Sequence, residues 1–191
     1  LERSSQMKHL LLTTIAAVVL AGCEEVSEVD LTLHEAISKG HDEMVELLIE
    51  QGADVNGKDV GGGAPLRWAA KFGHKEIAVL LIANGADVNA KNYFGWTSLH
   101  EAAGVGHGKI CLLLIEKGAD VNARADGGWT PLQDSAMKGH TEVVKILLDN
   151  GAMVNAKVYG KTPLDWADER KKKETADLLR KHGGKTGEEL K

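Results

Sequence analysis

The chain has 191 residues, of which 43% are apolar, 27% are charged and only 4% are aromatic. This composition is that of an ordinary soluble protein, apart from its shortage of aromatic residues and its 22 glycines. The formal net charge of −5 and a pI near 5.9 argue against a nucleic-acid-binding protein, which usually presents a basic surface.

The first segment has the features of an export signal. Lys8 precedes an apolar run from Leu10 to Leu20, and Ala21-Gly22-Cys23 follows it. As a helix this run reaches only about 16 Å, roughly half of a ~30 Å hydrocarbon core, so a cleaved signal fits better than a membrane span. Small residues before a cysteine resemble the lipobox of bacterial lipoproteins, a resemblance that implies cleavage before Cys23 and acylation of Cys23.

We therefore expect upstream residues and a signal peptide over residues 1–22, and an acidic tether over residues 23–29. The alternative is a plain signal peptide, with Cys23 incidental and the protein secreted. If Cys23 carries lipid, no intrachain disulfide is possible, because Cys111 is then the last cysteine left and stands in an apolar helical stripe. The resemblance implies a lipoprotein anchored to a membrane of the bacterial cell envelope, facing the periplasm or the cell surface.

A fixed period governs the rest of the chain. The phrase Gly-Ala-x-Val-Asn begins at Gly52, Gly85, Gly118 and Gly151, 33 residues apart each time. An x-Pro/Ser-Leu phrase starts at positions 64, 97, 130 and 162, and Gly-His recurs at 40, 73, 106 and 139. A period between 20 and 50 residues is the signature of a stacked repeat array.

Each unit predicts two short antiparallel helices and a loop. Thr130 is a good N-cap, and Pro131 suits the first helical position. Gly139 ends the first helix, and Gly151 ends an apolar second helix by adopting positive φ. Neither helix can bury its apolar stripe alone, so stability must come from stacking neighbouring units.

Several motifs of each unit resemble those of ankyrin repeats. They are the Thr-Pro-Leu-His-like phrase, the paired alanines, Gly-His and the final Gly-Ala-Asp-Val-Asn. The resemblance implies an all-α solenoid of about five stacked helix-turn-helix repeats with hairpin-like loops, and a protein whose usual work is to bind other proteins. It covers residues 30–184, with a polar C-terminal tail over 185–191 that we expect to fray. The expected repeats are about 30–56, 57–89, 90–122, 123–155 and 156–184.

Two departures from the family pattern are informative. The first unit lacks the proline and follows no earlier loop, so it should be the N-terminal cap. The family histidine that ties the turn by hydrogen bonds is replaced by Arg67, Gln133 and Asp165, so the resemblance does not carry that tie over to three units.

No constellation of residues predicts chemistry. His41, His74, His107 and His140 occupy one repeated position, so a stacked layer separates each from the next, and a structural role outweighs ligation of one ion. No nucleophile, phosphate-loop or calcium-loop motif occurs in the chain. We expect no catalytic residues, no metal and no cofactor, and hence not an enzyme.

The better candidates are recognition residues. In ankyrin proteins the finger tips and the exposed side of the first helices line a concave face, and the resemblance carries that role to matching positions here. Tyr93 and Phe94 are the strongest contact candidates, because finger-tip residues have little to pack against. The tryptophans have an alternative role in covering loops or packing between helices, and Val79 and Leu112 on the second helices are expected to be partly buried between layers. The full set of expected partner-binding residues is Val60, Trp68, Lys71, Phe72, Tyr93, Phe94, Trp96, Glu101, Val105, Asp126, Trp129, Asp134, Lys138, Tyr159, Lys161, Trp166 and Glu169.

The leading hypothesis is a non-catalytic scaffold, a lipid-anchored envelope adaptor that binds another protein on its concave face. We expect a monomer that contacts the membrane only through Cys23 and binds no nucleic acid. The alternative is an immunity or protective module that sheathes an envelope toxin or enzyme. An enzyme would need a pocket with convergent polar groups, which stacked helices rarely provide.

Overall fold

The computed structural model describes residues 32–191. The predicted signal peptide, the acidic tether and Cys23 therefore lie outside the described residues. Within residues 32–191 ten α-helices and one short 3-10 helix follow one another: α2 (Leu33–Ser38), α3 (Asp42–Glu50), α4 (Pro65–Phe72), α5 (Lys75–Ala83), α6 (Ser98–Val105), α7 (Gly108–Glu116), η1 (Asp126–Gly128), α8 (Pro131–Lys138), α9 (Thr141–Asp149), α10 (Pro163–Glu169) and α11 (Lys173–Lys181).

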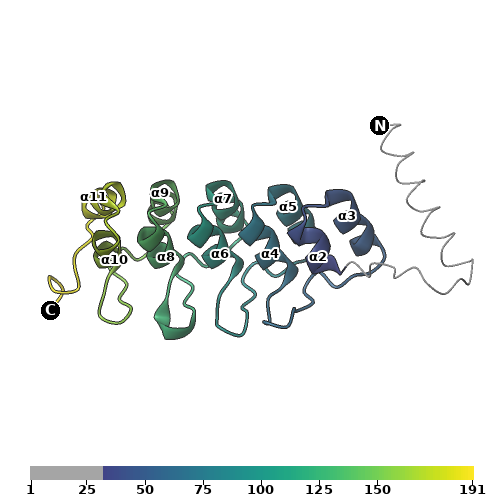
Figure 1. Cartoon of the computed structure of the whole chain (residues 1–191), viewed down its shortest axis with the longest axis horizontal. Coiled ribbons are helices and arrows are strands. Elements are labelled where there is room, and N and C mark those ends of the chain that lie inside the picture. Colours follow the sequence, from purple (N-terminus) through teal and green to yellow (C-terminus); the bar gives the residue numbers. More distant parts are fainter. Residues whose placement is uncertain (1–31) are drawn as a thin grey trace, which may run out of the picture. The chain divides into compact units, whose positions relative to one another are not determined.

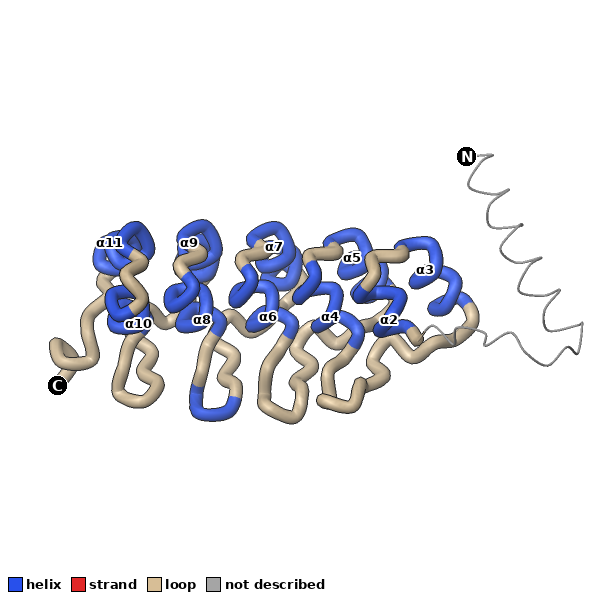
Figure 2. Tube along the Cα trace, in the orientation of Figure 1, coloured by secondary structure: helices blue, strands red, loops and turns tan. Residues whose placement is uncertain are grey.

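The helices of residues 32–191 form two parallel rows (Figures 1 and 2). The inner row contains α2, α4, α6, α8 and α10, and finger-like loops project from its side; the outer row contains α3, α5, α7, α9 and α11. Each helix packs against its pair mate and against its neighbours in the same row. In the described part of the chain, β pairing is limited to an isolated bridge between Val158 and Lys161. The predicted all-α repeat solenoid is therefore confirmed.

Capping residues define where the inner helices begin and end. The Thr130 hydroxyl caps α8 by accepting the backbone N–H of Gln133, and Pro131 follows at the first helical position, where its missing N–H removes no helical hydrogen bond. Gly139 ends the helix with a φ of 83°, a conformation that glycine adopts without strain. α4 differs because Ala64 stands at its N-cap and offers no side-chain oxygen.

The hydrogen bonds that tie the turn before the inner helix are present at two of the three positions where the family histidine is replaced. Gln133 Oε1 accepts the backbone N–H of Thr130 at 2.8 Å and its hydroxyl at 3.0 Å. Asp165 Oδ2 accepts the same two groups of Thr162 at 2.7 and 2.9 Å. Gln133 and Asp165 therefore keep the tie that the sequence left open, because an amide or carboxylate oxygen accepts the same hydrogen bonds as an imidazole nitrogen.

A ladder of asparagines joins each repeat to the next. Asn56 donates to the carbonyl of Gly85 at 3.0 Å and accepts the backbone N–H of Asp87 at 2.8 Å. Both partners lie in the next repeat, so each asparagine links two neighbouring units. Each such bond contributes about 1 kcal/mol net. The same pair of bonds is made by Asn89, Asn122 and Asn155.

The repeated Gly-His phrase forms a second link between layers. His140 donates from Nε2 to the carbonyl of Gly104 at 3.0 Å, and its ring covers Gly106 of the preceding repeat. Gly106 has a φ of +85°, and a Cβ there would lie 2.7 Å from His140 Nδ1. The repeated histidine therefore has a packing role. Equivalent contacts are made by His74 on Gly40, His107 on Gly73 and Lys172 on Gly139.

Aliphatic side chains fill the layer between the two rows. Leu99 of α6 and Leu114 of α7 are fully buried, and so is Cys111, as its apolar position predicts. Burial raises the pKa of the Cys111 thiol to about 12, so this cysteine behaves as a small core residue. Val79 and Leu112 remain 45% and 41% exposed, which is more than the sequence predicts for residues packed between layers.

The C-terminal segment continues the ladder beyond the last helix. The Lys185 N–H donates to Asn155 Oδ1 at 2.8 Å, and its carbonyl, 2.7 Å from the Thr162 hydroxyl, shares the proton of that hydroxyl with Asp165. The Gly187 N–H then donates to Asp165 Oδ2 at 2.7 Å. The expected fraying of the tail is therefore wrong as far as Gly187, because these residues occupy the place of a further repeat's loop.

Candidate functional site

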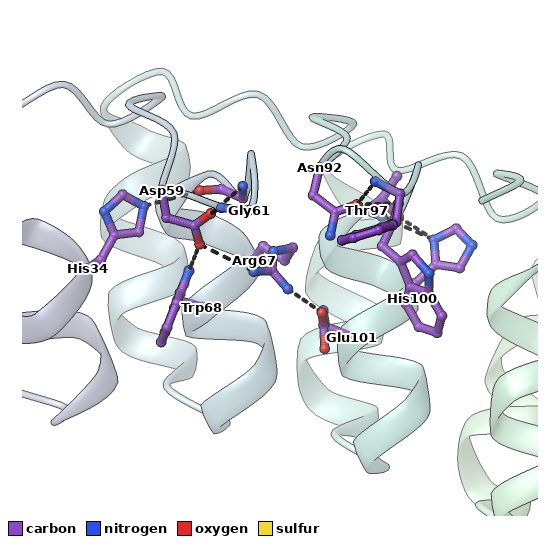
Figure 3. Close-up of polar contacts among 12 residues, drawn as sticks. His34, Asp59, Gly61, Arg67, Trp68, Asn92, Thr97, His100 and Glu101 are labelled. Atoms are coloured by element: carbon purple, nitrogen blue, oxygen red, sulfur yellow. Dashed lines mark hydrogen bonds and ion pairs between the residues drawn. The ribbon is translucent and has the colours of Figure 1, made fainter. Parts of the chain in front are cut away.

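Asp59 holds the loop before α4 in shape (Figure 3). Its Oδ1 accepts the N–H groups of Gly61 at 2.7 Å and Gly63 at 2.8 Å, and its Oδ2 accepts the indole N–H of Trp68 at 2.5 Å. Burial alone would raise the pKa of Asp59, but these hydrogen bonds and the charge of Arg67 outweigh it, so the pKa lies below its ordinary value. Asp59 is thus a fixed carboxylate that stiffens the loop.

Asn92 has the same role in the next loop. Its Oδ1 accepts the backbone N–H of Phe94 and of Trp96, both at 2.9 Å. Asp59 and Asn92 were not predicted from the sequence, although an Asp and an Asn one period apart, two residues before a loop tip, are typical of such turns. Ala125 stands at the third equivalent position, and there the 3-10 turn η1 shapes the loop instead.

Arg67 links two repeats on the inner row. Its guanidinium pairs with the carboxylate of Asp59 at 3.4 Å and with that of Glu101 on α6, and all three side chains are largely buried. At this position the tie made by the family histidine is absent, because Arg67 reaches across to the next repeat. Glu101, an expected contact residue, is therefore engaged within the chain.

Asp134 is the expected contact residue that lies deepest. It is 7% exposed, and its carboxylate lies directly over Gly104 of the preceding repeat. Burial raises the pKa of Asp134, an effect that the positive charge of Lys138 only partly offsets. Its position indicates packing between layers and not an open contact surface.

The finger tips are connected to one another. The Tyr93 N–H donates to the carbonyl of Gly61 at 3.2 Å, and the Asp126 N–H donates to that of Phe94 at 2.9 Å. The Tyr93 ring lies on Gly62 of the preceding loop, where a Cβ would be 2.6 Å from the ring. The expectation that tip residues have little to pack against is therefore wrong for Tyr93.

Apolar side chains nevertheless remain open at the tips. Tyr93 and Phe94 are 68% and 62% exposed even though their backbones are held by hydrogen bonds on both sides. The loops thus present exposed apolar groups on a fixed backbone. Other expected contact residues that are exposed and apolar are Val60 and Tyr159 on the loops and Phe72 and Val105 at the ends of α4 and α6.

The tryptophans are partly buried and contact other residues of the chain. Trp129 and Trp166 have ring centroids 5.0 Å apart, and Lys161 Nζ lies 4.7 Å from the Trp166 ring. Trp68 lies 5.8 Å from Phe72. The packing role accounts for these contacts, so the open apolar groups of the candidate site are mainly the loop tips.

The expected contact set also contains charged residues of both signs. Lys161 and Glu169 form an ion pair of 2.6 Å. Lys71, Asp126 and Lys138 are exposed, so the face carries both signs of charge.

Among residues 32–191 no three His, Cys, Asp or Glu side chains are grouped so that they could hold a metal ion. Over the same part of the chain, every helix is too short or too polar to cross a membrane.

A family model described as ankyrin repeats (3 copies) matches residues 15–92, 33–125 and 124–188, which together cover more than half of the chain. The curated proteins contain no match to this sequence.

Proposed function

The chain belongs to the ankyrin-repeat family, and from this premise we propose that it is a non-catalytic scaffold that binds a partner protein through its finger tips. Ankyrin repeats are generally protein–protein interaction modules. The observation that carries the proposal is the pair Tyr93 and Phe94, which are exposed although Asn92 and the neighbouring loops fix their backbone. Rigid, exposed aromatic side chains are typical of binding hot spots, because little conformational entropy is lost on contact.

Phe94→Ala tests this proposal most cleanly. We expect capture of the partner to weaken by roughly 30-fold or more, the effect of removing a hot-spot aromatic. The free energy of unfolding should change by less than about 0.5 kcal/mol, because the Phe94 ring is mostly solvated. Tyr93→Ala should weaken capture too, but at some cost in stability, since its ring covers Gly62. The measurement is the yield of covalent adduct from a photo-crosslinking amino acid at position 60, introduced into the full chain in its source cells.

A second crosslinker position provides the control. The same amino acid at Asp177, on the outer helix α11, should give no such adduct. An adduct yield at position 60 that is unaffected by Phe94→Ala would contradict the finger-tip site. If the captured protein is an enzyme or toxin whose activity falls on binding, the protective-module alternative is favoured over the adaptor.

We further propose that the scaffold is tethered to a membrane of the bacterial envelope through acylated Cys23. This part is supported by the sequence alone, in which small residues precede Cys23 directly after an apolar run. More than one acyl chain gives durable attachment, where a single chain is marginal. The acidic residues that follow Cys23 disfavour contact with anionic headgroups, so the repeats would lie near the bilayer without entering it.

Cys23→Ala is expected to abolish incorporation of radiolabelled palmitate and to release the protein from the membrane fraction. The physical reason is the loss of the thiol and of the new amino group that would carry the acyl chains. The unsubstituted full chain and a Cys111→Ala variant, which keeps Cys23, are the controls, and both should take up the label. Labelling that persists in Cys23→Ala would contradict the anchor.

A further inference from the structure

An outward stripe on α7 is exposed. Lys109, Leu112 and Glu116 are spaced i, i+3 and i+7, which places them on one helical face, and all three are exposed. Leu112 is 41% exposed, and Val79 beside it on α5 is 45% exposed. Together with Lys75 and the buried Leu113, these residues line a shallow groove between the two outer helices.

The other repeats do not carry this pattern. In α9 the three positions are Glu142, Lys145 and Asp149, and Lys145 is already paired with Asp149 at 3.0 Å. In α3 all three positions are glutamates. Within residues 32–191 no ion pair joins Lys109 or Glu116 to another side chain. α7 thus presents an open cation, an apolar residue and an open anion in line.

We propose that a second copy of this chain docks here, with the two α7 helices antiparallel about a two-fold axis at Leu112. Lys109 and Glu116 lie about 4.5 and 6 Å from Leu112 along the helix, so Leu112 is close to the midpoint between the two charges. A two-fold interface requires a surface that complements itself. Antiparallel docking meets this requirement, because Lys109 of each copy faces Glu116 of the other and the two Leu112 side chains meet at the axis, beside Val79.

This dimer differs from the monomer expected from the sequence, and it leaves the finger tips free. In the described repeats, the outer row of helices lies on the side away from the finger-like loops (Figure 1). Two copies joined through α7 would therefore present their tips in opposite directions. Such a pair holds two partner molecules, one on each side.

Charge exchange in the full-length protein tests the proposal, with sedimentation equilibrium as the measurement. Lys109→Glu should raise the dimer dissociation constant at least 10-fold, because like charges then face each other. Lys109→Glu combined with Glu116→Lys should restore it to within about 3-fold of the unchanged chain, since the exchanged pairs match again across the axis. Leu112→Lys should abolish the dimer without unfolding, because α9 already carries Lys145 at that position.

Glu43→Lys, at the position of Lys109 in the first repeat, is the matched control and should leave the dissociation constant unchanged. A monomer at all concentrations up to about 1 mM, the upper limit of weak association, would overturn the proposal. So would a double variant that associates no better than Lys109→Glu alone. Either result leaves the finger-tip site untouched, because that site is read out by crosslinking at position 60.

Discussion

His100→Gln is expected to remove the acid destabilisation of the repeat stack between pH 6.5 and about 4. His100 is fully buried at the start of α6, and its Nδ1 accepts the N–H of Thr97 at 3.2 Å and the hydroxyl of Thr97 at 2.9 Å. Its Nε2 donates to the carbonyl of Trp129 at 3.2 Å. Both nitrogens are therefore used by the neutral ring, and a proton on Nδ1 would break the bonds to Thr97.

The direction of the effect follows from the pKa. Burial lowers the pKa of His100 from 6.5 to about 4, so in this interval the unfolded chain binds a proton that the folded chain does not. Stability is complete above pH 6.5 and falls as the pH decreases towards 4. At about 1.4 kcal/mol per pH unit, the loss amounts to about 3 kcal/mol.

The chain itself shows why glutamine is a suitable replacement. Gln133, one repeat later, makes the same two bonds to Thr130 and donates from Nε2 to the carbonyl of Ala156 at 2.9 Å. Urea unfolding should therefore give His100→Gln a stability within about 1 kcal/mol of the unchanged chain at pH 7 and about 2 to 3 kcal/mol above it near pH 4.

His34→Gln is the matched control, because His34 holds the equivalent place in the first repeat but is partly exposed. That variant should keep the acid sensitivity of the unchanged chain. An equal pH dependence in His100→Gln and the unchanged chain would show that another group is responsible.

Gly106→Ala is expected to lower the free energy of unfolding by about 2 to 4 kcal/mol. A side chain at a φ of +85° costs about 1 to 2 kcal/mol. The new methyl group would also meet the His140 ring at 2.7 Å, and displacing that ring from a packed site adds about 1 to 3 kcal/mol. The displaced ring would lose its hydrogen bond to Gly104 as well.

Gly118→Ala separates the two costs. Gly118 has nearly the same conformation, a φ of +90°, but nothing lies within 4 Å of the Cβ position. Urea unfolding should give Gly118→Ala only the backbone cost, about 1 to 2 kcal/mol. If both variants lose the same stability, the contact between His140 and Gly106 contributes nothing.

The period of 33 residues was enough to predict the architecture, because it depends on local signals such as Thr130, Pro131 and Gly139 that act within one unit. What one unit offers to the next was harder to predict. The paired bonds of Asn56 and the covering of Gly106 by His140 arise only after stacking. Repetition of a residue signals that it matters, but not which neighbour it contacts.

The candidate site shows the same limit. That the tips carry open apolar groups could be predicted from residue type and register, as Phe94 shows. The burial of Asp134 and the engagement of Glu101 by Arg67 could not, because both depend on side chains from two different repeats. Residues assigned to the concave face by register alone therefore include some that hold the layers together.

The docked C-terminal segment bears on how an array of this kind can lengthen in evolution. Asn155 and Thr162 already bind Lys185, so a unit appended after the last residue would find those bonding groups occupied. A unit duplicated inside the array, for example after Asn89, would meet an asparagine and a Gly-Ala-Asp-Val-Asn phrase like its own on either side. Internal duplication is therefore a route by which such a protein gains length while its docked C-terminal segment keeps its hydrogen bonds.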